Sequence, residues 1–120
     1  VLQPAEINVS SMDENFLKEL RGIIEKNLGE PLFGVEQLAG ELYMSRATLY
    51  RKVVALTGQS PHQFVRSYRL KRAAQLFDAN FGNVSQVALE VGFSNFAHFS
   101  RCFKEAFHQS PSAYQSSKSA

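Results

Sequence analysis

The sequence of 120 residues has no tryptophan and only one cysteine, Cys102. A single cysteine excludes an internal disulfide framework and suits a reducing compartment, so we expect a cytoplasmic domain. No apolar run approaches the ~20 residues of a membrane-spanning helix, and no signal-peptide pattern opens the chain, which argues against direct membrane contact. The first residue is Val1 rather than methionine, which indicates a fragment or a processed form of a longer protein.

The residue patterns that support catalysis are absent as well. The chain has no glycine-rich phosphate loop and no pair of metal ligands at a recognised spacing, and its three histidines are scattered. Cys102 lies between Arg101 and Lys104, which would favour a thiolate, but helical phase places it beside Phe99, which favours a packed thiol. A redox sensor would also need a second cysteine. We therefore expect no enzyme activity and no bound metal or cofactor.

The charges are distributed unevenly along the chain, although the net charge is only +2. Residues 1–44 hold eight acidic and three basic residues, a net charge of −5. Residues 45–120 hold ten basic and three acidic residues, a net charge of +7. A basic segment of this kind is typical of a protein that binds a polyanion. An ordinary solvated surface explains the charge equally well, so further evidence has to come from motifs.

Helix signals recur along the chain and no segment alternates with the period of a strand, so we predict an all-α fold of seven short helices. Ser11 and Glu14 have the spacing of a capping box at the start of the first helix. Ser45 and Ser94 stand at the starts of two others, and Ser-Pro pairs mark two more. The expected helices span about residues 11–28, 35–42, 45–57, 61–77, 83–91, 94–107 and 110–114.

An internal repeat relates the two halves of the chain. Residues 35–45 align with residues 84–94 through five identities, with apolar residues at matching positions. One residue is then inserted, after which Arg51 matches Arg101 and each copy closes on a Ser-Pro pair. A short helix, a tight turn and a longer capped helix make a helix-turn-helix unit. The predicted domains are a linker or tail at 1–10, a first subdomain at 11–60, a connecting helix at 61–78 and a second subdomain at 79–120.

Several segments within about residues 13–116 keep a common order and spacing: Leu38-Ala39, Ser45-Arg46-x-x-Leu49-x-Arg51, Thr57-Gly58-x-Ser60-Pro61-x-x-Phe64-Val65-Arg66, Arg69-Leu70-x-x-Ala73, Ala88-x-x-Val91-Gly92-Phe93, Phe99-x-Arg101-x-Phe103-Lys104 and Ser110-Pro111-x-x-Tyr114. In these segments the chain resembles the AraC/XylS-type transcription regulators. The acidic first helix and residues 49–52 are most similar to the output domains of hybrid two-component sensors. The resemblance implies double-stranded DNA as partner, an upstream sensor or receiver domain in the same chain, and membrane tethering of a parent protein of the hybrid-sensor type.

Two residues depart from the pattern of the repeat. Tyr43 stands in the turn of the first copy where the second has Gly92, and His108 stands where the first copy has Gly58. Glycine at such positions usually supplies a left-handed backbone. We therefore expect both turns to be strained or differently shaped.

Helical phase leaves matching faces of the two longer repeat helices exposed. In the resembled family, base edges are contacted from the positions that match Ala47, Tyr50, Arg51, Ala97, Ser100 and Arg101. A guanidinium pairs bidentately with guanine O6 and N7, so Arg51 and Arg101 are expected to contact guanine. Ala47 and Ala97 suit contact with thymine methyl groups. In the resembled family the position that matches Phe96 can also reach DNA, but the phase of Phe96 relative to Phe99 and Phe103 favours packing.

Polar and basic residues around these faces are expected to contact phosphates, which position a protein without specifying sequence. Three arginines recur every third residue along the connecting helix, and two serines expose helix N-termini whose N–H groups suit phosphate. For each charged residue, a solvated surface charge is the alternative. The phosphate-contacting candidates are Ser45, Arg46, Lys52, Arg66, Arg69, Arg72, Ser94, His98 and Lys104.

Together these features predict sequence-specific binding of double-stranded DNA, with two recognition helices in successive major-groove segments. The alternative is a helical protein-interaction module, which would expose an apolar groove and bind with little dependence on salt. The acidic first helix has two further candidate partners, RNA polymerase and an upstream domain of the same chain.

Overall fold

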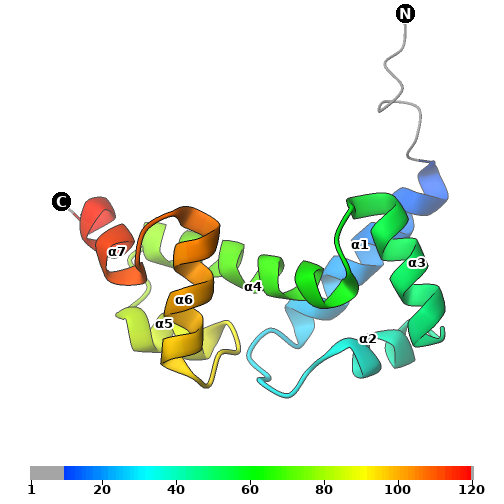
Figure 1. The fold of residues 1–120 in the computed structure, drawn as a ribbon, viewed down its shortest axis with the longest axis horizontal. Helices are drawn as coiled ribbons and strands as arrows, with labels where there is room; N and C mark the ends of the chain where they lie inside the picture. The colour runs from blue at the N-terminus through cyan, green and yellow to red at the C-terminus, as the bar shows by residue number, and fades with distance from the viewer. Residues whose placement is uncertain (1–9, 120) are drawn as a thin grey trace, which may run out of the picture. The chain divides into compact units, whose positions relative to one another are not determined.

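The computed structural model describes residues 10–119, so the tail expected at residues 1–10 lies outside the described residues except for Ser10. The described chain contains seven helices and no strand, which confirms the predicted all-α fold (Figure 1). The helices are α1 (Ser11–Lys26), α2 (Val35–Glu41), α3 (Arg46–Thr57), α4 (Pro61–Asp78), α5 (Val84–Glu90), α6 (Phe96–Phe107) and α7 (Pro111–Ser119).

The chain forms two compact units. Among the described residues, the first consists of residues 10–27 and 34–64, and the second consists of residues 28–33 and 65–119. The boundary between the units therefore falls inside α4. We had expected residues 61–78 to form a connecting helix between two subdomains. The loop at residues 28–33 belongs to the second unit, although it precedes the first helix-turn-helix in the sequence.

The first unit packs α1 against α2 and α2 against α3. The core side chains recur three or four residues apart along each helix, as helix packing requires. Those with almost no exposed surface are Leu20, Ile24, Leu38, Leu49 and Val53. This arrangement fixes the rotation of α3 about its own axis, and with it the face that α3 presents to solvent.

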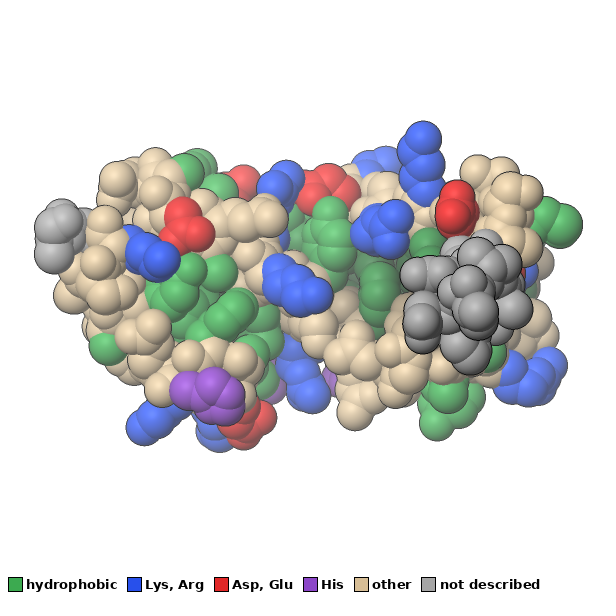
Figure 2. All heavy atoms as spheres, turned by 90° about the horizontal axis from the view of Figure 1, so that it is seen from above, with side chains coloured by type: hydrophobic (Ala, Val, Ile, Leu, Met, Phe, Trp, Pro, Cys, Tyr) green, Lys and Arg blue, Asp and Glu red, His purple; other side chains and the backbone are tan. Residues whose placement is uncertain are grey.

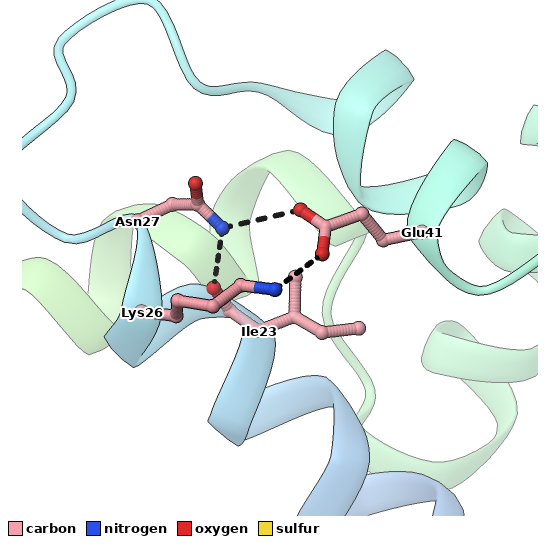
Figure 3. A network of polar contacts seen from close by, with 4 residues as sticks. All are labelled: Ile23, Lys26, Asn27 and Glu41. Atoms are coloured by element: carbon pink, nitrogen blue, oxygen red, sulfur yellow. Dashed lines mark hydrogen bonds and ion pairs between the residues drawn. The ribbon is translucent and has the colours of Figure 1, made fainter.

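A polar network joins the ends of α1 and α2 (Figure 3). Lys26 Nζ donates to Glu41 Oε1 at 2.8 Å, and Asn27 Nδ2 donates both to Glu41 Oε2 at 3.2 Å and to the Ile23 carbonyl oxygen at 2.9 Å. The hydrogen bond from Lys26 is the main reason why the pKa of Glu41 is lowered from its ordinary value of 4.5. The network therefore stabilises the first unit only while Glu41 is ionised.

Glu41→Gln tests this network by its dependence on pH. A carboxylate with a depressed folded-state pKa stabilises the fold above its unfolded pKa, and that stabilisation is lost as the pH falls through the folded pKa. We expect the variant to unfold at lower urea concentration than wild type near neutral pH, and the difference to shrink below about pH 4. Glu19→Gln on α1 is the control. An equal difference at both pH values would contradict the expected role of the charge.

The second unit has an aromatic core. The Phe77 and Phe103 rings meet edge to face at 5.7 Å between centroids, and the Phe103 and Tyr114 rings at 5.4 Å. Tyr114 also donates from its hydroxyl to Asp78 Oδ1 at 3.0 Å, which attaches α7 to α4. Cys102 is buried in the same core, so its interpretation as a packed thiol is confirmed.

Arg69 is buried in the second unit, with only 6% of its surface exposed. Its Nη1 donates to the carbonyl oxygens of Leu28 and Val91 at 3.2 and 2.9 Å, and its Nη2 donates to those of Glu30 and Phe33 at 3.0 and 3.4 Å. Burial lowers the pKa of this guanidinium, which remains charged because an arginine starts from so high a value. The prediction that Arg69 contacts a phosphate was therefore wrong, because all of these donors serve backbone carbonyls.

The two residues that replace glycine in the repeat have a positive φ, as the glycines they match do. Tyr43 has φ 56° where Gly92 has φ 89°, and His108 has φ 63° where Gly58 has φ 75°. Both non-glycine residues therefore lie in the strained left-handed region, as we had expected.

Two helix starts lie one residue away from the prediction. Ser10, not Ser11, is the N-cap of α1, and it forms a capping box with Asp13. Asn95, not Ser94, is the N-cap of α6, and its side chain accepts from the backbone N–H of His98. The last helix also continues to Ser119, past the turn predicted at 110–114.

Candidate nucleic-acid interface

Helix α3 begins at a complete N-cap and is anchored by its apolar face. Ser45 Oγ accepts from the backbone N–H of Thr48 at 3.1 Å and donates to Thr48 Oγ1 at 2.9 Å. Leu49 and Val53, one turn apart, are fully buried in the core of the first unit. The opposite face must therefore point to solvent, because side chains at these spacings share one side of a helix.

The solvent face of α3 carries Arg51 among apolar and aromatic groups. Ala47 and Arg51 are exposed, and Tyr50 and Val54 expose 54% and 36% of their surface. Arg51 Nη2 lies 3.4 Å from Thr48 Oγ1, a long hydrogen bond within the same helix that leaves the guanidinium at the surface. The structure thus brings the three residues predicted to contact bases in the first copy, 47, 50 and 51, onto one exposed face.

Helix α6 repeats this arrangement in the second unit. Phe99 and Phe103 are fully buried, while Ala97, Arg101 and Lys104 are exposed and Ser100 is half-buried. The predicted base-contacting residues of the second copy therefore also share one face. We call α3 and α6 the recognition helices.

One side chain of α6 lies differently from the phase-based expectation. Phe96 was expected to pack but exposes 43% of its surface. Phe96 is the first residue of the helix, where fewer core side chains remain to cover it. Sequence phase missed Phe96 as a surface residue, although its place directly after an N-cap was a usable signal.

Three of the candidates for phosphate contact interact with other side chains of the protein. Arg46 Nη1 lies 3.6 Å from Glu36 Oε1, an exposed pair, and Lys52 Nζ lies 4.6 Å from the centre of the Phe16 ring. Arg72 is half-buried and its Nη1 donates to Gln75 Oε1 at 2.9 Å. Exposed contacts of these kinds are worth about 1 kcal/mol or less, so a phosphate can replace them.

The remaining candidates are exposed or half-buried. Lys104 and the two serines, Ser45 and Ser94, are exposed, whereas Arg66 is half-buried. His98 is also half-buried, and its ring lies 5.7 Å from that of Phe93. Basic side chains project at many points in Figure 2, with hydrophobic side chains exposed between them. Apart from Arg69, the predicted set therefore lies where solvent or a ligand reaches it.

Comparison with known proteins identifies the fold and the family. The helix-turn-helix domain family matches residues 38–117. The DNA-binding domain of the global transcriptional factor AdpA, solved in complex with a target DNA, is 33% identical, and the match covers 84% of this chain and 90% of that one with a TM-score of 0.77. An AraC-type transcriptional regulator from Chromobacterium violaceum is 28% identical, covers 91% and 96% of the two chains, and has a TM-score of 0.80.

The chain belongs to the AraC-type helix-turn-helix family. It is therefore a DNA-binding domain of the kind that serves transcription regulators, a class without enzymatic activity. The resemblance that the sequence motifs indicated is confirmed.

One relative points to the context of this AraC-type domain. Histidine kinase P4 from Formosa agariphila is 43% identical over 114 residues, which cover 95% of this chain but only 8% of the kinase. The chain spans between 8% and 38% of the curated relatives it matches. These relatives thus contain much sequence beyond the AraC-type domain.

Among residues 10–119, no group of three or more His, Cys, Asp or Glu side chains is placed to hold a metal ion. None of the helices in that range combines the length and apolar character needed to cross a membrane.

Proposed function

We propose that α3 and α6 contact the base edges of a double-stranded DNA site, each in its own segment of the major groove. The observation that carries this proposal is the match between their exposed faces. Arg51 and Arg101 occupy equivalent positions of the repeat, both outward, on helices whose opposite faces are fully buried. Each helix packs in its own unit and presents an arginine at the equivalent position. This pattern is expected when the two helices contact similar ligands.

The two arginines supply the strongest contribution to base recognition. A guanidinium carries parallel N–H donors that match guanine O6 and N7 in the major groove. Ala47 and Ala97 lie one turn before them and are small enough to approach a thymine methyl group. Tyr50 and Ser100 bring hydroxyl groups that can donate to or accept from a base edge.

The phosphate contacts come from the margins of the recognition helices and from α4. We assign them to Ser45, Arg46, Lys52, Arg66, Arg72, Ser94, His98 and Lys104. Arg69 is removed from this set because it is buried. With two recognition helices in one chain, the groove segments should follow one another about one helical turn, or ~10 base pairs, apart.

The parent protein is proposed to be a bacterial two-component regulator, with this domain as its output. The support is the similarity to a histidine kinase over nearly the whole of this chain. An upstream sensor or receiver domain of the same polypeptide would then control DNA binding in the cytoplasm, and a parent of the hybrid-sensor type would be tethered to the membrane. RNA polymerase is a further proposed partner, for which α1 offers exposed side chains of both charges.

Alanine variants of the two arginines test the proposal. Sites are first selected from random duplex DNA with the 120-residue chain, and affinities are then measured on the selected duplex. Arg51→Ala and Arg101→Ala are each expected to cost about 1–3 kcal/mol and to relax preference at one guanine.

The matched control is Arg21→Ala, which removes the same charge from the exposed face of α1. It should change affinity little and leave base preference intact. If both recognition-helix variants kept wild-type affinity and preference, the assignment of α3 and α6 would be refuted.

A further inference from the structure

The turn before α6 is buried and rests on a side chain of α4. Val91, Gly92 and Phe93, which form this turn, are all buried. Arg69 Nη1 donates to the Val91 carbonyl oxygen at 2.9 Å. The guanidinium lies so close to the turn that no side chain would fit at Gly92. A small shift of the turn would therefore either break this hydrogen bond or push the backbone into the guanidinium.

The same guanidinium holds the loop Leu28–Phe33, which belongs to the second unit. Its Nη1 also donates to the Leu28 carbonyl oxygen at 3.2 Å, and its Nη2 donates to those of Glu30 and Phe33 at 3.0 and 3.4 Å. A guanidinium is planar and its donors point in fixed directions. Moving the loop or the turn alone would leave buried polar groups unpaired, which is costly. Arg69 thus fixes the turn relative to the loop.

The turn of the first copy lies open to solvent instead. Its central residue, Tyr43, exposes 96% of its surface, whereas the matching Gly92 is buried. At the repeat offset of 50, the residue of α1 that corresponds to Arg69 is Glu19, which is exposed. The next residue of each helix is a buried leucine, which supports this alignment of α1 with α4. The two recognition helices therefore follow turns that are held differently.

The turn sets the direction in which α6 leaves it. Phe99 and Phe103 are fully buried and decide which face of α6 points inward, but apolar packing is non-directional. Arg101 lies five residues after the start of α6, about 7.5 Å along the helix axis, so a tilt of ~10° at the turn would move it by about 1 Å. A binding group has to be held to within about 0.5 Å of its productive position.

We propose that Arg69 is a positioning residue for base recognition. By tying the turn before α6 to the loop Leu28–Phe33, it holds α6 in the orientation in which Arg101 reaches both acceptors of a guanine. Arg69 acts through α6 and does not itself touch DNA, because it is buried. This inference rests on the proposed function, because it requires Arg101 to contact a base.

The test measures base preference separately in the two half-sites. The readout is the ratio of two dissociation constants, one for a duplex substituted at a single guanine and one for the duplex selected from random DNA with the 120-residue chain. The guanine of each half-site is the one at which Arg51→Ala or Arg101→Ala relaxes preference. Unfolded chains bind neither duplex specifically, so a loss of stability alone leaves the ratio unchanged.

Arg69→Met keeps the apolar stem of the side chain and removes the guanidinium. The ratio at the guanine assigned to Arg101 is expected to fall by roughly 2- to 12-fold, the effect of losing one of its two hydrogen bonds. The ratio at the guanine assigned to Arg51 should keep its wild-type value. In an Arg101→Ala background, Arg69→Met should change neither ratio further.

A conservative variant keeps the test informative if Arg69→Met does not fold. Arg69→Lys retains the charge but gathers three donors on one nitrogen, too few for the four carbonyl oxygens. It should give a ratio between those of the wild type and Arg69→Met at the Arg101 guanine. Circular dichroism establishes that each variant is folded.

Pro31→Gly changes the loop without changing Arg69. The Phe33 N–H donates to the Glu30 carbonyl oxygen at 3.1 Å, so Pro31 lies inside a tight turn, where proline restricts the backbone. Glycine loosens that turn. The variant should lower the ratio at the Arg101 guanine, by less than Arg69→Met does. The ratio at the Arg51 guanine should be spared, although the loop directly precedes α2 in the sequence.

The matched control is Gln115→Ala. Gln115 Nε2 donates to the Gly82 carbonyl oxygen at 2.6 Å, a hydrogen bond from a side chain to a loop carbonyl within the same unit. That bond holds the loop before α5 rather than the turn before α6. The variant should leave both ratios unchanged.

The possible results distinguish this inference from the proposed function. Wild-type ratios in the folded Arg69 variants would overturn the inference and leave the proposed function standing. Equal losses at both guanines, or a loss in Gln115→Ala as large as in the Arg69 variants, would overturn it in favour of general loosening. A change confined to the Arg51 guanine in Pro31→Gly would show that the loop acts through α2 and not through Arg69. If Arg101→Ala relaxed no guanine, the proposed function itself would fail.

Discussion

Gly92→Ala is expected to lower the free energy of unfolding of the second unit by about 3–5 kcal/mol, against about 1 kcal/mol for Gly58→Ala in the first. Both glycines have positive φ, so alanine introduces backbone strain of similar size at each. They differ in their surroundings. A Cβ on Gly58 meets open space, whereas a Cβ on Gly92 would overlap Arg69 Nη1 and the Leu28 carbonyl oxygen.

The larger cost at Gly92 arises because Arg69 cannot move away cheaply. Its guanidinium is held by four backbone carbonyls, and displacing it leaves buried polar groups without their partners. Urea unfolding followed by circular dichroism measures both variants, and hydrogen exchange of the backbone amides assigns each loss to its unit. Equal losses in the two variants would contradict the argument.

A double variant isolates the contribution of the guanidinium. In an Arg69→Met background, the methionine side chain lacks the donors, so Gly92→Ala should cost less than in wild type, but still more than Gly58→Ala because the overlap with the Leu28 carbonyl oxygen remains. Full additivity of Arg69→Met and Gly92→Ala would show that the two residues act independently.

DNA affinity should fall steeply with salt. Five basic side chains are assigned to phosphates, and the two recognition arginines add to the positive charge at the interface. Neutralising five to seven phosphates predicts a log–log slope of roughly −4.5 to −6.3, or a loss of roughly 500- to 6,000-fold between 50 and 200 mM salt. The physical cause is the release of counterions that the phosphates hold in free DNA.

Titrations at several salt concentrations measure this slope on the selected duplex. Lys104→Ala should reduce its magnitude by about one, whereas Lys18→Ala on α1 should leave it unchanged. A slope near zero would favour an apolar protein partner over DNA.

Sequence alone was sufficient for the features set by local pattern. The seven helices, the repeat and the outward faces of α3 and α6 follow from capping residues and from apolar side chains at helical spacing. Tyr50, Arg51 and Arg101 lie exposed as predicted. Leu49 and Phe99 are buried in the core, so the opposite faces of their helices must point to solvent. Whether these side chains contact bases remains a prediction.

The errors share a different physical origin. At the start of α1, Ser10 with Asp13 and Ser11 with Glu14 have the same capping spacing, so the pattern does not choose between them. Arg69 is one of three arginines in a regular stripe, and its acceptors at Leu28–Phe33 lie about forty residues earlier. Helical phase describes a side of a helix, but the partners that reach that side depend on tertiary structure.

The cap of α6 has a similar explanation. A repeat offset of 50 pairs Ser45 with Asn95, so the residue inserted in the second copy lies within the turn rather than after the cap. Phe96 was misplaced for a related reason, since phase treats every turn of a helix alike although core packing ends near the first residue.

The path of the chain between the two units has a consequence for truncated forms. Because Leu28–Phe33 belongs with residues 65–120, a fragment that starts at Val65 lacks three of the four carbonyls that accept from Arg69. Such a fragment would carry a buried cation without most of its partners, so a cut between the two helix-turn-helix copies does not yield a self-sufficient C-terminal half. During synthesis on the ribosome, the first unit can be complete once Phe64 has emerged. The loop Leu28–Phe33 can pack only after α4 and Val91, its partners in the second unit, have been synthesised. The two copies are therefore consecutive in sequence but are not separable modules.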